Sequence, residues 1–322
     1  MRLLSRVLAV AALAFATQAA GQAWPAKPIK VVVPYPAGGY YDVVGRVIGQ
    51  KLSEALGQPV VVENRAGANA IIGTEFVAKS PSDGYTIMVG GSGPHAINTS
   101  LYPKLPYDAV KDFAPVAHVS TSANTLVVAA THPANSLKDL LAMAKARPGA
   151  VSYASNGAGS TVHLCAELMA SMAGLKLNHV PFKGSAPAIT AVLGSQVDFA
   201  FATAGDVLPH IKAGKLKALA VTTARRVAAT PDVPTMAEAG LPDFEAVAWF
   251  AFFAPAGTPA DIVGRLNQEI NRALREADVR ERLSAQGSAE LIGGPPERLG
   301  QLREKEIAKW AQVIRAAGVT PN

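Results

Sequence analysis

Cysteine is almost absent from this 322-residue chain, which has Cys165 alone. An internal disulfide is therefore excluded, and the single thiol is most simply a buried, inert side chain on a helix. Metal-binding patterns are missing too, because the six histidines are dispersed and form neither an HExxH motif nor a Cys/His cluster. We expect no metal and no cofactor. Val162 stands where a dinucleotide fingerprint after Gly157 and Gly159 would need its last glycine.

Charged residues make up 17% of the chain and aromatic residues 6%. The Lys and Arg residues are scattered, with neither a basic block nor an aromatic stacking motif, so nucleic acid is a poor candidate as a partner. The net charge of +6 at pH 7 is compatible with anionic ligands and is only a weak indication of them.

Beyond the N-terminus, no apolar run reaches the roughly 20 residues that a membrane-spanning helix needs. Arg2 and Arg6 precede an apolar, alanine-rich stretch at residues 7–16, and small residues follow up to Ala23. This pattern predicts a cleavable signal peptide at residues 1–23, cut after Ala23 or alternatively after Ala20. An uncleaved anchor helix is the lesser alternative. The mature protein is expected outside the cytoplasm.

The remaining chain is long enough for one large domain or two ordinary ones. Apolar β-branched runs alternate with helical patterns along most of it. The predicted strands are 29–33, 60–63, 85–89, 151–154, 179–182, 197–202, 216–222 and 290–292. A short piece at 114–119 leads into 126–130, and the chain later runs through 246–254; these stretches are not assigned to an element. The predicted helices are 43–56, 70–78, 136–146, 161–173, 186–193, 205–213, 259–276, 279–286 and 296–316.

Two successive α/β units and a return segment predict an α/β fold with two lobes and a ligand cleft between them. Each lobe is expected to be a mostly parallel sheet flanked by helices. We assign residues 24–124 and 250–322 to lobe 1 and residues 125–249 to lobe 2. The chain is expected to cross between them near residues 120–126 and 246–250. A single doubly wound sheet is the alternative.

The first predicted strand is followed by a turn rich in proline and glycine, and a helical pattern starts at Asp42. Gly38 and Gly39 allow positive φ and close approach of the backbone. Bare N–H groups between a strand and a helix bind anions. For Asp42 we favour helix capping over ligand contact. Three tyrosines are suited to pack on an organic ligand or simply at the loop: Tyr35, Tyr40 and Tyr41.

A second glycine-rich turn, residues 155–161, also lies between a predicted strand and a predicted helix. Ser160 is equally suited to hold a carboxylate there or to cap the helix. His163 lies in the first turn of that helix, where a neutral imidazole is favoured over a charged one. Lys183, at another such junction, either meets a ligand anion or faces solvent. Thr203 follows a predicted strand and is suited to face the cleft.

A third turn, residues 90–95, makes Ser92 a plausible ligand contact, because strand carboxyl ends point at the ligand crevice of an open sheet. Ser92 superficially resembles a hydrolase nucleophile. That motif needs glycine where Pro94 stands, and no supporting triad is visible, so we reject it.

Several runs, in order over essentially the whole mature chain, resemble the Bug family, the extracytoplasmic solute receptors of tripartite tricarboxylate transporters. They are Trp24-Pro-Ala-Lys-Pro28, Val33-Pro-Tyr-Pro-Ala-Gly-Gly39 with Asp42, Val62-Glu-Asn-Arg-Ala-Gly67, Ser82-Asp-Gly-Tyr-Thr86, Asn156-Gly-Ala-Gly-Ser160 with His163, Phe182-Lys-Gly184 with Pro187-Ala188, Leu208-Pro-His-Ile-Lys-Ala-Gly214 and Ala254-Pro-Ala-Gly-Thr-Pro259.

The resemblance implies a periplasmic, non-enzymatic binding protein that closes on a small carboxylate and delivers it to integral membrane permease subunits. We expect a monomer. Many relatives carry an acidic residue where this chain has Ala202, which favours a plain carboxylate over an amino acid as the ligand. The implied ligand-binding residues are Tyr35, Ala37, Gly38, Gly39, Asp42, Ser92, Asn156, Gly159, Ser160, His163 and Thr203.

Two other functions stay open at this stage. A secreted enzyme acting on a carboxylate would need a nucleophile–base pair, an acid pair or a metal set in the cleft. The sequence shows none of these. A receptor that serves sensing instead of uptake has no distinguishing mark in the sequence.

Overall fold

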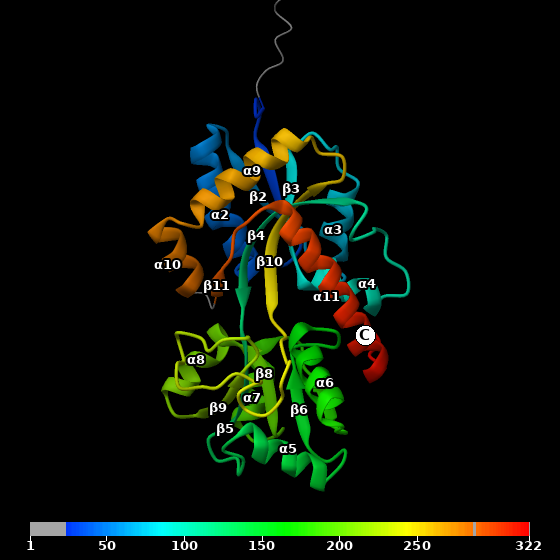
Figure 1. Cartoon of the computed structure of the whole chain (residues 1–322), viewed down its shortest axis with the longest axis vertical. Coiled ribbons are helices and arrows are strands. Elements are labelled where there is room, and N and C mark those ends of the chain that lie inside the picture. The colour runs from blue at the N-terminus through cyan, green and yellow to red at the C-terminus, as the bar shows by residue number, and fades with distance from the viewer. Residues whose placement is uncertain (1–23, 286–287, 322) are drawn as a thin grey trace, which may run out of the picture.

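The computed structural model of the chain describes residues 24–285 and 288–321. The predicted signal peptide, residues 1–23, lies outside the described residues. Figure 1 shows two lobes, stacked along the long axis of the molecule, each built on one sheet with helices packed around it. The predicted two-lobed α/β fold is confirmed.

The first lobe has a six-stranded sheet with the order β11-β4-β10-β3-β1-β2. Its strands are β1 (Ile29–Val33), β2 (Val60–Asn64), β3 (Thr86–Gly91), β4 (Phe113–Ser122), β10 (Ala248–Pro255) and β11 (Ser288–Leu291). Its helices are α2 (Tyr40–Leu56), α3 (Ile71–Ala78), a π-helical turn η1 (Gly93–Ile97), α4 (Asn98–Leu101), α9 (Ala260–Ala273), α10 (Ala277–Ala285) and α11 (Pro296–Ala317).

The second lobe has a five-stranded sheet with the order β7-β6-β8-β5-β9. Its strands are β5 (Asn124–Ala129), β6 (Ser152–Ser155), β7 (Asn178–Pro181), β8 (Phe199–Thr203) and β9 (Leu216–Val221). Its helices are α5 (Leu137–Ala146), α6 (Thr161–Ala173), α7 (Ser185–Leu193) and α8 (Ala204–Lys212).

Each sheet is mixed. Strands β2, β1 and β3 are parallel, as are β7, β6 and β8. The antiparallel pairs, which the expectation of mostly parallel sheets did not include, involve strands next to the two chain crossings. Strand β4 passes through Ala123 directly into β5, and β10 brings the chain back. Because the chain leaves and returns side by side, β4 and β10 run in opposite directions.

The first sheet is buried on both faces, and adjacent residues of β10 point to opposite faces. Trp249 belongs to a hydrophobic cluster that includes Leu299 and Trp310 of α11. Phe250 belongs to the cluster that includes Val44 of α2. Helix α11 also packs against α6, so it connects the two lobes (Figure 1).

Local signals set most helix ends as the sequence predicts. Ser136 Oγ accepts a hydrogen bond from Asp139 N at 3.1 Å and begins α5, and Gly174 ends α6 with φ of 65°. The helix predicted to start at residue 259 starts at Ala260, with Pro259 as its N-cap and no side-chain cap from Thr258. Thr258 Oγ1 instead donates to the Pro255 carbonyl at 2.7 Å. Among the described helices, none has the length and apolarity needed to cross a membrane.

Candidate functional site

The carboxyl ends of strands from both sheets face one another at the waist of the molecule. Strand β4 runs into the second lobe, and β3 and β1 run in the same direction because β10 is antiparallel to both β4 and β3. In the second lobe, β8 is antiparallel to the departing β5, so β8, β6 and β7 end toward the first lobe. Ligands of open α/β sheets bind outside strand carboxyl ends. The waist is therefore the place where a ligand can meet both lobes (Figure 1).

The first glycine loop, residues 34–39, follows β1 and is held in place by Asp42. Asp42 is 4% exposed, and its Oδ2 accepts from Gly38 N at 3.0 Å and from Arg46 Nε at 2.9 Å. Its Oδ1 accepts from Asn64 Nδ2 at 3.0 Å. Burial raises the pKa of Asp42, but the bonds from Arg46, Gly38 and Asn64 outweigh burial and hold the pKa below its ordinary value.

Position 38 favours glycine, because its φ of +88° is strained for a residue that has a Cβ. The N-cap of α2 is Gly39, and no side chain caps the helix there, since Asp42 bonds the preceding residue, Gly38. The first N–H groups of that helix are therefore open to water or to an anion. Ala37, Gly38 and Gly39 are exposed.

Aromatic rings lie behind this loop. The rings of Tyr35 and Tyr41 are 4.3 Å apart between centroids, and Tyr41 packs edge-on against Phe250 at 4.7 Å. Tyr40 Oη and Ser120 Oγ are hydrogen-bonded at 2.9 Å. Burial raises the pKa of both Tyr35 and Tyr41, so the two phenols stay neutral.

Ser92 lies at the end of β3 and is only 1% exposed. Its Oγ accepts a hydrogen bond from Trp249 N at 2.8 Å, which joins β3 to β10. The structure therefore places Ser92 at the waist and gives its hydroxyl a bond within the first lobe.

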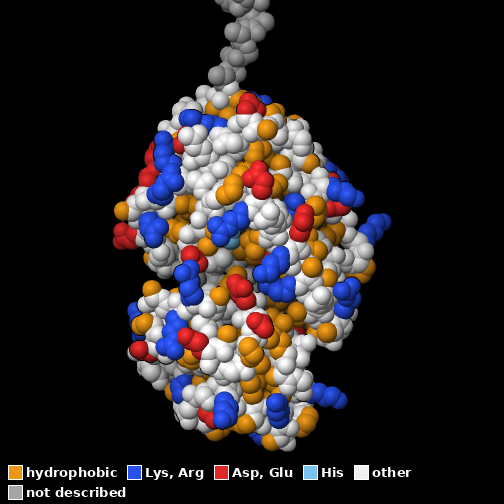
Figure 2. Space-filling view, viewed as in Figure 1, with side chains coloured by type: hydrophobic (Ala, Val, Ile, Leu, Met, Phe, Trp, Pro, Cys, Tyr) orange, Lys and Arg blue, Asp and Glu red, His pale blue; other side chains and the backbone are white. Residues whose placement is uncertain are grey.

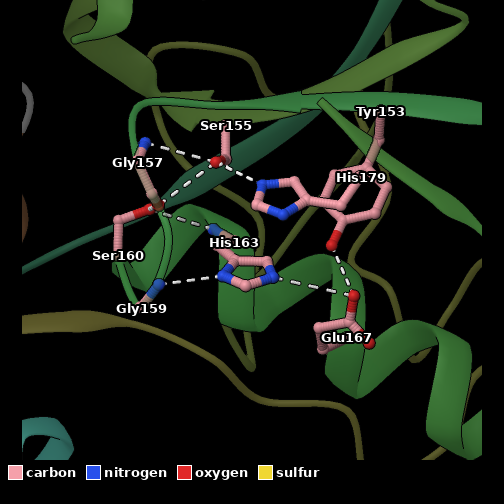
Figure 3. A network of polar contacts seen from close by, with 8 residues as sticks. All are labelled: Tyr153, Ser155, Gly157, Gly159, Ser160, His163, Glu167 and His179. Carbon is pink, nitrogen blue, oxygen red and sulfur yellow. Dashed lines mark hydrogen bonds and ion pairs between the residues drawn. The ribbon is translucent and has the colours of Figure 1, made fainter. Parts of the chain in front are cut away.

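The second glycine loop, residues 156–160, is supported from beneath by a polar network (Figure 3). His163 Nδ1 accepts from Gly159 N at 2.9 Å, which requires the neutral Nε2–H tautomer. Ser155 Oγ bonds Gly157 N at 3.2 Å and His179 Nε2 at 2.7 Å. Ser160 Oγ accepts from His163 N at 3.3 Å. Ser160 therefore caps α6, and its hydroxyl donates to the Gly157 carbonyl at 2.7 Å.

The rings of this network stack. The His163 and His179 rings are 3.9 Å apart, and Tyr153 lies 4.8 Å from His179. Burial lowers the pKa of His179 to about 4, so that ring is neutral near pH 7. Glu167 lies 3.7 Å from His163 Nε2 and accepts from the Tyr153 hydroxyl. Burial raises the pKa of Glu167, but the bonds from His163 and Tyr153 bring it below its ordinary value.

The second loop also contacts the first lobe. A Cβ added at Gly159, whose φ is +72°, would lie 2.2 Å from Leu101 Cδ2 of α4. Asn156 Nδ2 donates to Ser185 Oγ at 3.5 Å, and its buried Oδ1 has no partner within the described residues. Thr203, at the end of β8, donates from Oγ1 to Asp206 at 2.7 Å. Asn156 and Ala202 line one small cavity.

This arrangement is suited to holding an anion, with backbone N–H groups and neutral side chains at two facing loops. Among the described residues, neither the His95 nor the His163 ring bonds Ser92 or Ser160 as the enzyme alternative would need: the His95 ring stacks on Phe253 at 3.9 Å, and the His163 ring contacts Gly159 N and Glu167. Ser155 bonds His179, but it is 1% exposed and lies under the loop. The described residues contain no group of three or more His, Cys, Asp or Glu that could hold a metal ion.

Sequence reasoning missed the residues that support the loops. Glu167 lies four residues after His163, a spacing that places both on one helix face and was a usable signal. Tyr153, His179 and Asn64 come from separate strands, and only the folded chain brings them to the loops.

Replacing His163 by phenylalanine tests whether the imidazole positions the second glycine loop. Phenylalanine keeps a ring beside His179 but leaves Gly159 N–H without its acceptor, which should lower the free energy of unfolding by about 1–3 kcal/mol. Urea unfolding measures the loss. His163→Asn is the comparison, because its amide oxygen can restore the acceptor. Equal losses in both variants would show that the ring, and not its Nδ1, matters.

Three comparisons with known proteins point to the same family. The model of the family described as "Tripartite tricarboxylate transporter family receptor" matches residues 44–319. Protein BugT of Bordetella pertussis is 42% identical over 321 residues, which is 98% of each chain.

Of three similar solved structures, two carry a small dicarboxylate. An R. palustris protein with adipate is 37% identical with a TM-score of 0.80, over 93% of this chain and 100% of that one. MatC of Rhodopseudomonas palustris with bound malate is 35% identical with a TM-score of 0.75, over 90% of this chain and 100% of that one. The periplasmic binding protein BugD is 34% identical with a TM-score of 0.77, over 93% of this chain and 100% of that one.

Proposed function

Because the chain belongs to the tripartite tricarboxylate transporter receptor family, a family of solute-binding receptors and not of enzymes, we propose that it captures a small organic carboxylate and delivers it to membrane permease subunits. It acts as a monomer in the periplasm, after removal of residues 1–23. The observation that supports the proposal most is the pair of glycine loops at facing strand ends, each with backbone N–H groups fixed by buried side chains. The adipate and malate carried by similar structures are small dicarboxylates.

We assign the ligand carboxylate to the first glycine loop at Ala37, Gly38 and Gly39, with Tyr35 beside it. Asp42 acts on the ligand through Gly38. Across the cleft, Asn156, Gly159, Ser160, His163 and Thr203 complete the site, and Ser92 lies at its edge. Lobe 1 comprises residues 24–124 and 250–322 and lobe 2 comprises residues 125–249, boundaries that lie within two residues of the starts of β5 (Asn124) and β10 (Ala248).

The absence of a carboxylate at Ala202 bears on the ligand. This residue is 5% exposed and offers no counter-charge to an ammonium group. Asn156 Oδ1, the unpaired acceptor next to it, offers a neutral oxygen. The cleft is therefore matched to a plain or hydroxylated dicarboxylate in preference to an amino acid.

The test is thermal unfolding of the purified mature protein against a panel of C4–C8 dicarboxylates, hydroxy acids, aromatic acids and amino acids. A ligand present at 100 times its dissociation constant should stabilise the folded protein by about 2.7 kcal/mol. Stabilisation by dicarboxylates, confirmed by calorimetric titration, is the expected result. If no acid in the panel stabilises the protein, the proposed function is wrong.

A further inference from the structure

A second cavity, of about 490 Å³, lies at the waist away from the glycine loops. Its walls come from β4, β10, β11 with the segment after it and the start of α11 in the first lobe, from residues 223–228 after β9, and from residues 245–247 before β10. Figure 1 shows these first-lobe elements at the front of the waist. In Figure 2, basic and acidic side chains lie close together over the same area. We call it the hinge cavity.

The hinge cavity and the first glycine loop lie on opposite faces of the first sheet. Trp249 lines the cavity and packs with α11, whereas its neighbour Phe250 packs with Tyr40 and Tyr41 of α2. Helix α2 begins at the first glycine loop. A molecule in the hinge cavity would therefore not occupy the proposed carboxylate cleft.

Two buried polar atoms of the cavity lining have no partner within the described residues: Trp249 Nε1 and His118 Nε2. Trp249 is fully buried and His118 is 7% exposed. An unpaired buried polar atom costs about 1–3 kcal/mol, so such atoms call for an explanation.

The two atoms have opposite hydrogen-bonding roles. The indole Nε1–H is a donor. Burial lowers the pKa of His118 to about 4, and a hydrogen bond with the Ser120 backbone only partly offsets that effect. That bond favours the hydrogen on Nδ1, so the neutral ring presents Nε2 as an acceptor. The cavity therefore offers one donor and one acceptor that water does not reach freely.

The charged side chains that line the cavity also leave one group of each sign without a partner. Arg225 pairs with Glu290 at 2.8 Å, across the two lobes, and Arg226 pairs with Glu238 at 2.8 Å. Arg298 and Glu245 remain, and neither forms an ion pair with another described residue. One unpaired cation and one unpaired anion thus accompany one donor and one acceptor in the same cavity.

We propose that the hinge cavity binds a small amino acid as its zwitterion. Its carboxylate lies at Arg298 and the Trp249 indole N–H, and its ammonium group lies at Glu245 and His118 Nε2. A ligand with charge of one sign would leave one of the two unpaired charged side chains without a partner. Because residues of both lobes line the cavity, the bound molecule touches both sides of the hinge.

The indole N–H of Trp249 reports binding directly, because the chain has three tryptophans and so gives three indole signals in an ¹⁵N–¹H spectrum. Trp249→Phe assigns the signal. The probes are L-alanine, L-leucine and L-phenylalanine, each paired with its deaminated acid: propionate, 4-methylpentanoate and 3-phenylpropionate. We expect at least one amino acid to shift the Trp249 signal in the full mature protein, and its deaminated partner to bind at least tenfold more weakly at this site. The Trp310 signal should not move, since its Nε1 already donates to Glu306 at 2.9 Å.

Arg298→Gln should weaken the amino-acid titration at least tenfold, whereas Arg315→Gln, at the other end of the same helix, should leave it unchanged. Both arginines are exposed, so neither variant should compromise folding. No Trp249 shift with about 10 mM of any probe, equal shifts with the deaminated acids, or an unaffected Arg298→Gln would each overturn the proposal. Dicarboxylate stabilisation should persist in Arg298→Gln, which separates this test from that of the proposed function.

Discussion

Replacing Asp42 by alanine should weaken carboxylate binding about a hundredfold and lower the free energy of unfolding by about 2–3 kcal/mol. The carboxylate is the only described group that connects Gly38 N, Arg46 and Asn64. Without it, Gly38 N–H loses its acceptor, and the Asn64 amide keeps only the Tyr35 carbonyl, so the first glycine loop loses the bond that fixes its φ and ψ at Gly38. The affinity falls because the loop must then be ordered at the moment of binding. Calorimetric titration and urea unfolding measure the two effects.

Asp139→Ala is the matched control for this variant. Asp139 occupies the same position of α5 as Asp42 does in α2, and its Oδ2 likewise accepts from the N–H that precedes the N-cap, Asn135 N, at 3.0 Å. It is exposed and far from both glycine loops. We expect a smaller loss of stability and unchanged affinity. If both variants bind equally well, the first glycine loop does not hold the ligand.

The contribution of Asp42 to stability should depend on pH, in a direction that follows from its lowered pKa. Since the pKa of Asp42 is lowered in the folded protein, its contribution to stability is present above the unfolded value of about 3.9 and is lost as the pH falls through the folded value. The difference in unfolding free energy between the wild type and Asp42→Asn should therefore shrink on acidification below that value.

Strands, helices and their order were largely predictable, because the hydrophobic period and the capping residues are local signals. The predicted ends of β1 and α6 coincide with the observed ones. The mixed character of the sheets was not predictable in this way. It depends on which strands carry the chain between the lobes, and a strand such as β10 has the same apolar pattern in either direction.

The same limit applies to the site. Glycine turns after β1 and β6 were recognisable, since glycine and proline mark strand ends. The role of Ser92 was not, because its bond with Trp249 N joins residues 157 positions apart. The prediction placed a turn at residues 90–95 and assigned no element to residues 96–101, whereas the structure has the short helices η1 and α4 there, and Leu101 at their end contacts the second glycine loop.

Replacing Gly91 by alanine should lower the free energy of unfolding by about 3 kcal/mol, or prevent folding of the first lobe altogether. Gly91 is the last residue of β3 and pairs with Phe250 of β10. A Cβ there would lie 2.2 Å from the Trp249 carbonyl oxygen and 2.7 Å from Tyr41 Oη. The tyrosine hydroxyl can move, but the carbonyl belongs to the neighbouring strand, so β3 and β10 would have to separate at the waist.

That separation would act on both proposed sites, which makes Gly91→Ala informative beyond stability. It would stretch the bond from Trp249 N to Ser92 Oγ and shift Tyr41 under the first glycine loop, so carboxylate affinity should fall together with stability. Gly264→Ala in α9 is the control of opposite sign. Apart from the nearby backbone of its own helix and its two chain neighbours, no described atom lies within 4 Å of its added Cβ, and alanine in a helix interior is favoured over glycine by about 0.5–1 kcal/mol. The urea midpoint of unfolding should therefore fall in Gly91→Ala and rise in Gly264→Ala. A Gly91→Ala protein as stable as the wild type would show that β3 and β10 tolerate a wider spacing than this close contact implies.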